Sequence, residues 1–337
     1  MIKDHISTIT LLDPFIGSKN IGDQIIHDYI SERLFDMFPD SMRVALPTHS
    51  KLTKSEFSMV RDNELCFLCG TNLIGSDMRN VKQWNIDMFD RKLFGNSVIC
   101  FGVGWWQYQD APNTYTKILL DKILSRKYLH SVRDHYTEEK FCELGFDNVI
   151  NTACPTTWDL TPEHCAAIPR EKRDCAVFTI TDYARDPELI QRMLEIIRKH
   201  YSELYFFQQG TKDMQYLQET TSLSGIRVIQ PTLAAYDALL KEKHPDFIGT
   251  RLHGGIRALQ HSCRALIVGI DNRALELSKD INLPVITMNE PDNLEHALTD
   301  GWEIALRIPS ENIRKWKEQF ESPKQVMQSS PEYAKQE

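Results

Sequence analysis

Residues 245–271, PDFIGTRLHGGIRALQHSCRALIVGID, join a short apolar strand, a helix that two glycines open, and a second apolar strand. Strand, helix and strand in this order are typical of parallel α/β layers. Arg251 and His253 stand at the first strand-to-helix turn and flank Leu252, so both polar side chains can point to one side. The start of the helix adds its own partial positive charge. The turn therefore predicts a binding site for an anion.

The same alternation of apolar runs and amphipathic helical stretches extends over most of the 337 residues. It predicts an α/β fold with two consecutive Rossmann-like, doubly wound units. Residues 22–37 and 114–126 repeat apolar side chains at the spacing of a helix. The expected strands lie at residues 7–12, 43–46, 65–69, 97–102, 128–132 and 148–151 in the first half, and at 175–180, 203–208, 226–230, 246–250, 265–270 and 284–288 in the second.

We predict one Rossmann-like domain over residues 1–160 and another over residues 170–308. The polar, proline-bearing stretch 157–174 suits a linker between them. Residues 309–337 should hold a helix from about 311 to 320 and then a polar tail. Ligands of open α/β sheets collect at the carboxyl ends of strands, so we expect the site in a cleft that the two domains face.

Composition and charge exclude several classes of protein. The formal net charge of −8 disfavours a nucleic-acid reader, whose affinity comes largely from basic residues. No run reaches the roughly 18 apolar residues of a membrane helix, and the first residues lack a signal-peptide pattern, so we expect a cytoplasmic protein. Cys66 and Cys69 form a CxxC inside an apolar strand, where they point to opposite faces. We therefore expect core thiols and no metal site.

The first strand-to-helix turn, GSKNIGDQII at residues 17–26, brings Asn20, Gly22 and Asp23 to the start of a helix. Its glycine spacing differs from the dinucleotide fingerprint GxGxxG. Asp23 has two interpretations. It complements the positive end of the helix, with Asn20 as a turn residue, or it accepts a proton from a substrate hydroxyl in a glycine-lined cleft.

Two further turns carry candidate residues. In CFGVGWWQYQD, residues 100–110, Gly104 precedes Trp105 and Trp106, which cannot both face one core. Aromatic faces bind sugars, but packing between domains is an equal alternative. In SVRD, residues 131–134, Arg133 follows a strand. It either pairs with a carboxylate such as Asp134 or Asp147, or captures a carboxylate or phosphate of a ligand.

Taken together, these segments resemble the polysaccharide pyruvyl transferase family over most of the chain. The segments that carry the resemblance are, in order, GSKNIGDQII, FGVGW, SVRD with NTACPTTWDL, TRLHGGIRAL, ALIVGID and LELSKDINLP. The resemblance implies two Rossmann-type domains like those of GT-B glycosyltransferases. It also implies transfer of a pyruvyl group from phosphoenolpyruvate to two hydroxyls of a sugar, as a ketal.

The resemblance also implies roles for single residues. His253 matches the histidine of the family's RLHG motif and should bind the donor and act in catalysis, while Asp23 should be a catalytic or acceptor-binding carboxylate. Where many relatives place a lysine, this chain has Asn272-Arg273-Ala274. The expected donor site comprises Arg133, Arg251, His253, Gly254 and Gly255 in a donor-side C-terminal domain, and the expected acceptor site comprises Asn20, Gly22, Gly104, Trp105 and Trp106 in the N-terminal domain.

The mechanism that we expect needs an acid to protonate the methylene carbon of the donor. His253 is assigned to this step because imidazole titrates nearest neutral pH. Arg251 and Arg133 would stabilise the carboxylate and the departing phosphate, and Asp23 would orient the first hydroxyl. We expect alanine at position 253 or 251 to lower turnover at least ~100-fold with the fold intact.

Phosphoenolpyruvate is expected as a co-substrate, with no tightly bound cofactor. The resemblance points to a sugar acceptor in capsule, exopolysaccharide or another cell-surface polysaccharide, galactose-containing by analogy, with a lipid-linked form as one option. Peripheral contact with the inner membrane would use Trp105, Trp106 and an exposed helix face with Trp316. The alternatives are a GT-B-type glycosyltransferase with a nucleotide-sugar donor, and a binding module without activity. The oligomeric state is left open.

Overall fold

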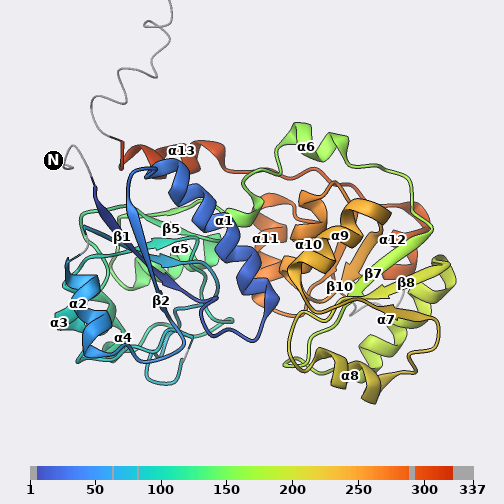
Figure 1. Cartoon of the computed structure of the whole chain (residues 1–337), viewed down its shortest axis with the longest axis horizontal. Helices are drawn as coiled ribbons and strands as arrows, with labels where there is room; N and C mark the ends of the chain where they lie inside the picture. The colour runs from blue at the N-terminus through green and yellow to red at the C-terminus, as the bar shows by residue number, and fades with distance from the viewer. Residues whose placement is uncertain (1–5, 63, 82, 288–292, 322–337) are drawn as a thin grey trace, which may run out of the picture.

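The computed structural model describes residues 6–62, 64–81, 83–287 and 293–321. Figure 1 shows two α/β halves side by side along the longest axis, with helix α1 (Ile21–Met37) running between them. All strand pairs registered within the described sheets are parallel. Parallel strands need crossover connections, and the helices between them supply these.

The N-terminal half holds a four-stranded sheet in the order β2-β1-β3-β4 and a β5-β6 pair. A parallel bridge between Val103 and Val132 joins the pair to the end of β4. The strands are β1 Thr8–Asp13, β2 Met42–Pro47, β3 Leu65–Cys69, β4 Val98–Phe101, β5 His130–Val132 and β6 Val149–Asn151. The other helical segments are α2 Lys54–Asp62, α3 Arg91–Phe94, α4 Thr114–Asp121, α5 His135–Glu143, η1 Pro155–Thr157 and α6 Pro162–Ala167.

The C-terminal half is one six-stranded sheet in the order β12-β11-β10-β7-β8-β9. Numbered from its own first strand, this is the 3-2-1-4-5-6 order of dinucleotide-binding folds, with its switch point between β7 and β10. The strands are β7 Cys175–Thr179, β8 Glu203–Phe206, β9 Ile226–Val228, β10 Asp246–Gly249, β11 Ala265–Val268 and β12 Val285–Ile286. The helices are α7 Pro187–His200, α8 Asp213–Thr220, α9 Leu233–Lys243, α10 Leu252–Gln260, α11 Asn272–Ile281, α12 Asn293–Asp300 and α13 Ser310–Glu318.

Every strand expected from the sequence is present, with ends that differ by a few residues. The last residue of the expected strand 284–288 lies outside the described part of the chain, as does the tail after residue 321. The stretch expected as a linker contains helix α6. Thr161 caps this helix by accepting from the backbone N–H of His164, and Pro162 occupies its first position, where a missing N–H does no harm.

Strand β3 is buried along its whole length. Cys66 belongs to the hydrophobic cluster on one face of the sheet and Cys69 to the cluster on the other, as the period of two predicts. Burial raises the pKa of the Cys66 thiol far above its ordinary value. Within the described residues no group of three or more His, Cys, Asp or Glu side chains could hold a metal ion.

The last described helix, α13, returns to the N-terminal half and covers its sheet (Figure 1). Trp316 is fully buried there against Phe67 and Phe101, and its indole N–H donates to the Leu129 carbonyl at 2.9 Å. The expectation of an exposed Trp316 face for membrane contact is therefore wrong, because the apolar side of this helix completes a core. No helix in the described ranges has the length and apolar character to cross a bilayer.

Candidate active site

The candidate residues gather where the two halves meet. Helix α1 packs on α10, with Ile25 in the same core cluster as Leu252 and Ile256. The turn before α1 also pairs with the loop after β8, through an antiparallel bridge between Asn20 and Gly210. These contacts bring the carboxyl ends of strands from both sheets together, which is where α/β folds bind ligands.

Asp23 lies in the first turn of α1 and is buried. The Ser18 hydroxyl donates to its Oδ2 at 2.6 Å. Burial raises the pKa of the Asp23 carboxyl, and the Ser18 hydrogen bond opposes this shift. A carboxylate with raised proton affinity at a helix start fits the proton-accepting interpretation better than a solvated complement to the helix dipole.

Asn20 and Gly22 have structural tasks in the contact between the halves. The Asn20 side chain caps α1, with Oδ1 accepting from the Gly22 N–H at 3.0 Å and from the Gln209 side chain at 3.1 Å. A Cβ at Gly22 would lie 2.6 Å from Gln209 Nε2, so a larger residue would displace the Gln209 side chain from its bond to Asn20. These contacts account for both residues without an acceptor sugar, and their acceptor-binding role stays a prediction.

Arg133 is completely buried. Its Nε donates to Asp134 at 3.2 Å, which is the ion pair expected from the sequence, and its Nη2 donates to Asn72 Oδ1 at 2.5 Å. Its Nη1 is buried with no hydrogen-bond partner within the described ranges. A buried guanidinium nitrogen without an acceptor is costly, so Arg133 has the capacity to bind one more oxygen.

The two adjacent tryptophans lie in different surroundings. Trp105 has no exposed surface and packs in the N-terminal core, while Trp106 is half-buried against the same cluster. Trp105 is therefore wrong as a platform for a sugar, because a stacking residue needs an open face. Gly104 lies against Arg133, where an added Cβ would stand 2.3 Å from Nη2.

His253 lies in the first turn of α10 and is buried. Its Nε2 lies 3.7 Å from the Cys154 sulfur, across the boundary between the halves. Burial and, to a smaller extent, the charges of Arg273 and Arg133 lower the pKa of His253 to about 3, with Asp271 opposing. The ring is thus neutral at pH 7, which corrects the expectation that it titrates near neutral pH.

Because His253 has a lower pKa in the folded than in the unfolded protein, the free energy of unfolding depends on pH in the acid range. The unfolded chain protonates His253 near its ordinary pKa of 6.5, whereas the folded protein does so only near 3. Unfolding therefore takes up a proton in this window, and the free energy of unfolding falls as the pH is lowered. We expect the stability difference between wild type and His253→Gln to change by up to ~1.4 kcal/mol per pH unit between these values. Urea denaturation at several pH values measures it, and a constant difference would contradict the shift.

Arg251 is also buried, but its guanidinium is engaged with protein carboxylates. It contacts Asp213 through two nitrogens, Asp182 Oδ1 at 3.0 Å and the Ile180 carbonyl at 3.2 Å. It therefore ties the loops after β7 and β8 to the start of α10. A ligand anion at Arg251 would compete with these carboxylates. Arg251 therefore has a clear structural role, and its role in donor binding stays a prediction.

The two glycines of the RLHGG segment have different surroundings. Gly255 packs on the sheet, where a Cβ would lie 2.5 Å from Ile267, and its N–H donates to the Arg251 carbonyl at 3.2 Å. Its N–H is thus engaged inside the helix, and its predicted contact with the donor stays a prediction. A Cβ at Gly254 would stand 3.0 Å from Gln209 Oε1, so Gly254 does face the contact between the halves.

Arg273 is the main site residue to which the sequence analysis gave no role. Its guanidinium binds Asp271 and the Tyr183 hydroxyl, and its charge lowers the pKa values of both Asp23 and His253. It therefore acts electrostatically on both predicted catalytic groups. A signal was available, because Asp271 caps α11 at a strand-to-helix turn of the kind that carries Arg251.

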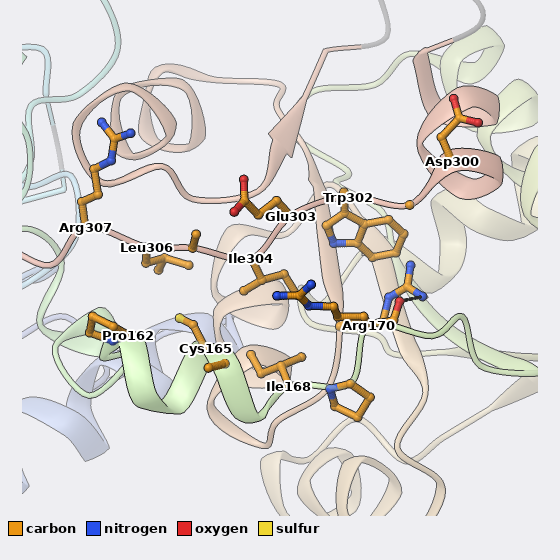
Figure 2. A pocket seen from close by; sticks show the side chains of 15 residues that line it. Pro162, Cys165, Ile168, Arg170, Asp300, Trp302, Glu303, Ile304, Leu306 and Arg307 are labelled. Carbon is orange, nitrogen blue, oxygen red and sulfur yellow. Dashed lines mark hydrogen bonds between the residues drawn. The ribbon is translucent and has the colours of Figure 1, made fainter.

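The best-defined cavity of the described chain lies elsewhere. Figure 2 shows a space of about 700 Å³ between the α6 region and residues 300–307, with Trp302 and Arg170 among its lining side chains. The Trp302 indole donates to the Ala265 carbonyl, at the amino end of β11. The cavity thus lies at the end of the sheet opposite to the one where such folds bind ligands, and no predicted site residue lines it.

Several solved structures are similar in fold to this chain. A protein from Listeria monocytogenes described as a UDP-N-acetylglucosamine 2-epimerase is 8% identical, with a TM-score of 0.51 over 93% of this chain and 91% of that one. S. aureus MnaA in a structure with UDP is 9% identical, with a TM-score of 0.49 over 88% of both chains. Acinetobacter baumannii MurG is 10% identical, with a TM-score of 0.40 over 93% and 94%. The predicted GT-B-like architecture is confirmed; identities this low speak for the fold alone.

A comparison with curated protein sequences gives no match. The family model "Polysaccharide pyruvyl transferase" matches residues 20–272. This range covers most of the chain, begins at the cap of α1 and includes Asp23, Arg133, Arg251 and His253. The resemblance seen in the sequence motifs is therefore confirmed, and the chain belongs to the polysaccharide pyruvyl transferase family.

Proposed function

We propose that this pyruvyl transferase takes its pyruvyl group from phosphoenolpyruvate and attaches it as a ketal to two hydroxyls of a sugar. The observation that carries the proposal is a group of cations contributed by both halves. Arg133 comes from the first half and is buried, with one nitrogen that has no partner among the described residues, and the partly buried Arg273 comes from the second half, where its charge acts on His253. Phosphoenolpyruvate carries a carboxylate and a phosphate close together, and guanidinium groups bind such oxygens in two-pronged geometry.

The reaction requires three changes at the donor. Carbon 3 takes one proton and becomes a methyl group, carbon 2 bonds to two sugar oxygens, and the bond between carbon 2 and the phosphate oxygen breaks. Of the two hydroxyl protons released by the sugar, one balances the proton added to carbon 3 and the other leaves with phosphate. We assign the carbon proton to His253, the charge stabilisation to Arg133, Arg251 and Arg273, and the first hydroxyl to Asp23.

The acceptor side of the proposal rests on Asp23 and the half-buried Trp106. Galactose bridged through oxygens 4 and 6, in a capsule, exopolysaccharide or other surface polysaccharide, is the acceptor that we propose to test first. Free, polymeric and lipid-linked forms share the same hydroxyl pair. No tightly bound cofactor enters this scheme, since every proton and charge is handled by side chains or by the donor.

The direct test is incubation with phosphoenolpyruvate and a panel of galactosides, with mass spectrometry of the acceptors and assay of phosphate release. The expected product is an acceptor that has gained one pyruvyl ketal. Thermal shifts with phosphoenolpyruvate and with nucleotide sugars form the second arm, because a ligand that binds the folded state raises its stability. Stabilisation by nucleotide sugars alone, without any pyruvylated product, would favour the glycosyltransferase alternative and contradict the proposal.

Gly104→Ala tests the role of Arg133 without touching its charge. The new Cβ would lie 2.3 Å from Arg133 Nη2 and 2.7 Å from Asn72 Oδ1, so the guanidinium must move. We expect phosphate release to fall ~10²-fold or more, the usual effect of losing one fixed donor to a developing charge. Gly225→Ala is the control: its positive φ of 75° strains the variant backbone, but no atom lies within 4 Å of the new Cβ. Equal activity in both variants would remove Arg133 from the site.

A further inference from the structure

Cys154 is the hydrogen-bond partner of the His253 ring. Its sulfur lies 3.7 Å from Nε2, and no other hydrogen-bond partner reaches the ring from the described residues. The thiol comes from the N-terminal half and the imidazole from the C-terminal half, and both are buried. The second contact of the sulfur is the Thr156 hydroxyl, at 3.0 Å. The thiol is thus held between a hydroxyl and the predicted catalytic ring.

The backbone around Cys154 is held in an unusual conformation. Ala153 has a φ of +59°, in the left-handed region that side chains disfavour, and its N–H donates to Asn151 Oδ1 at 2.9 Å. On the other side, the Pro155 ring fills the space beside Gly102, where a Cβ would lie 2.2 Å from Pro155 Cδ. Strain of this kind persists where the surrounding structure holds a residue for a task, and here it sets the sulfur toward His253.

The surroundings of Cys154 and His253 favour a neutral thiol and a neutral imidazole, and they also stabilise a transient thiolate. Burial raises the pKa of the Cys154 thiol, while the Thr156 hydrogen bond and the Arg133 charge oppose that rise. The same burial keeps the His253 ring neutral. A buried thiol beside a buried neutral imidazole, under the charge of an Arg133 that has one nitrogen without a partner in the described part of the chain, can pass a proton without charging the ring.

We propose that Cys154 and His253 form a proton relay, in which the thiol hydrogen bonds to Nε2 and the proton on Nδ1 is the one given to the substrate. The inference rests on the proposed pyruvyl transfer and names the source of its proton. It removes the difficulty that a neutral imidazole, by itself, is a poor acid for a carbon atom. Cys154 acts through His253. It is a positioning residue that also supplies the proton taken up by Nε2.

The steps balance in protons and charge. As carbon 3 of the donor takes the Nδ1 proton, Nε2 takes the thiol proton, so the ring stays neutral and a thiolate forms beside Arg133. The second sugar hydroxyl then gives its proton to Nδ1, and Nε2 returns its proton to the sulfur, while the first hydroxyl is left to Asp23. One hydroxyl proton has thereby moved to carbon 3. The sulfur forms no covalent bond to the donor and is neither oxidised nor reduced.

The first test observes the ring directly and needs no acceptor. Nitrogen-15 NMR of histidine-labelled protein at pH 7, with the His253 signals assigned by their loss in His253→Gln, reports which nitrogen carries the proton. We expect the proton on Nδ1 in wild type and in Cys154→Ser, and its partial transfer to Nε2 in Cys154→Ala. A proton on Nε2 in wild type, or a doubly protonated ring when phosphoenolpyruvate is added, would overturn the relay.

The second test separates a relay from simple orientation. We expect Cys154→Ala and Cys154→Ser each to lower kcat at least ~10-fold, with the KM for phosphoenolpyruvate changed less than about 3-fold. Serine keeps a hydrogen bond to the ring, but its hydroxyl is too weak an acid to release the proton. Cys165→Ala is the matched control, because this buried thiol donates to the Leu160 carbonyl at 3.5 Å and not to His253. Wild-type kcat in Cys154→Ser overturns the relay. If the wild type pyruvylates no acceptor, the proposed function is wrong. The NMR result then still shows whether Cys154 and His253 form the proposed hydrogen bond.

Discussion

Replacement of His253 by alanine lowers pyruvyl transfer at least ~100-fold, the expected loss for a group that gives a proton to carbon. The imidazole is buried beside Cys154 and under the influence of Arg133 and Arg273, so no solvent-accessible group can take its place. Phosphate release from phosphoenolpyruvate with the acceptor identified by mass spectrometry measures the effect. The loss should lie in kcat more than in KM, because the proton moves in the transition state.

His253→Gln provides the control for packing at this position. Glutamine fills much of the space of imidazole and hydrogen-bonds, but it cannot carry a proton through the ring. We expect a thermal stability near that of wild type together with the same loss of turnover. Near-normal phosphate release in either variant would reject the assignment of His253, and loss of folding in His253→Gln would contradict the expected near-wild-type stability.

Replacement of Arg251 by alanine destabilises the protein by ~3–5 kcal/mol, the usual result of removing one partner from a buried ion pair. The variant leaves Asp213, which is fully buried, without its main cation. Burial already raises the pKa of Asp213, and the Arg251 charge is what opposes this. The sequence analysis expected an intact fold for this variant, and the ion pair now leads us to expect a less stable one. Urea denaturation measures the loss.

A double variant separates the two roles of Arg251. Arg251→Met combined with Asp213→Asn removes both charges, so we expect it to recover most of the stability lost by Arg251→Ala. If the recovered protein still transfers pyruvate poorly, Arg251 also serves the donor. If its turnover is normal, Arg251 is structural and the donor is held by Arg133 and Arg273. A wild-type melting temperature in Arg251→Ala would contradict the ion-pair geometry itself.

The fold was predictable because its signal is local. Central parallel strands are buried on both faces and therefore read as short, nearly continuous apolar runs, such as residues 65–69 and 265–268. Each run is separated from the next by a helical period, so the order of elements needs no long-range information. The candidate turns followed from the same logic, since ligands of this architecture bind at the carboxyl ends of strands.

Three features of the site were not predictable because they depend on neighbours far away in the chain. From the sequence, Trp105 and Trp316 could be tryptophans that line a surface. In the structure, each completes a hydrophobic core built from elements that are distant in the chain. Arg251 reads as a free cation until the loop with Asp213 is folded against it. The effect of Arg273 on the pKa values of Asp23 and His253 arises only when α11 is folded near both.

The sequence by itself determined the architecture, the family and the turns that carry Asp23, Arg133, Arg251 and His253, because periodicity and motif order are properties of neighbouring residues. Only the tertiary structure decided which of these groups are charged, paired or buried. Burial holds His253 neutral, and two aspartates engage Arg251 while one nitrogen of Arg133 stays unpartnered among the described residues. The physical reason is that proton affinity and pairing depend on desolvation and on charges brought together across space, which no stretch of sequence contains.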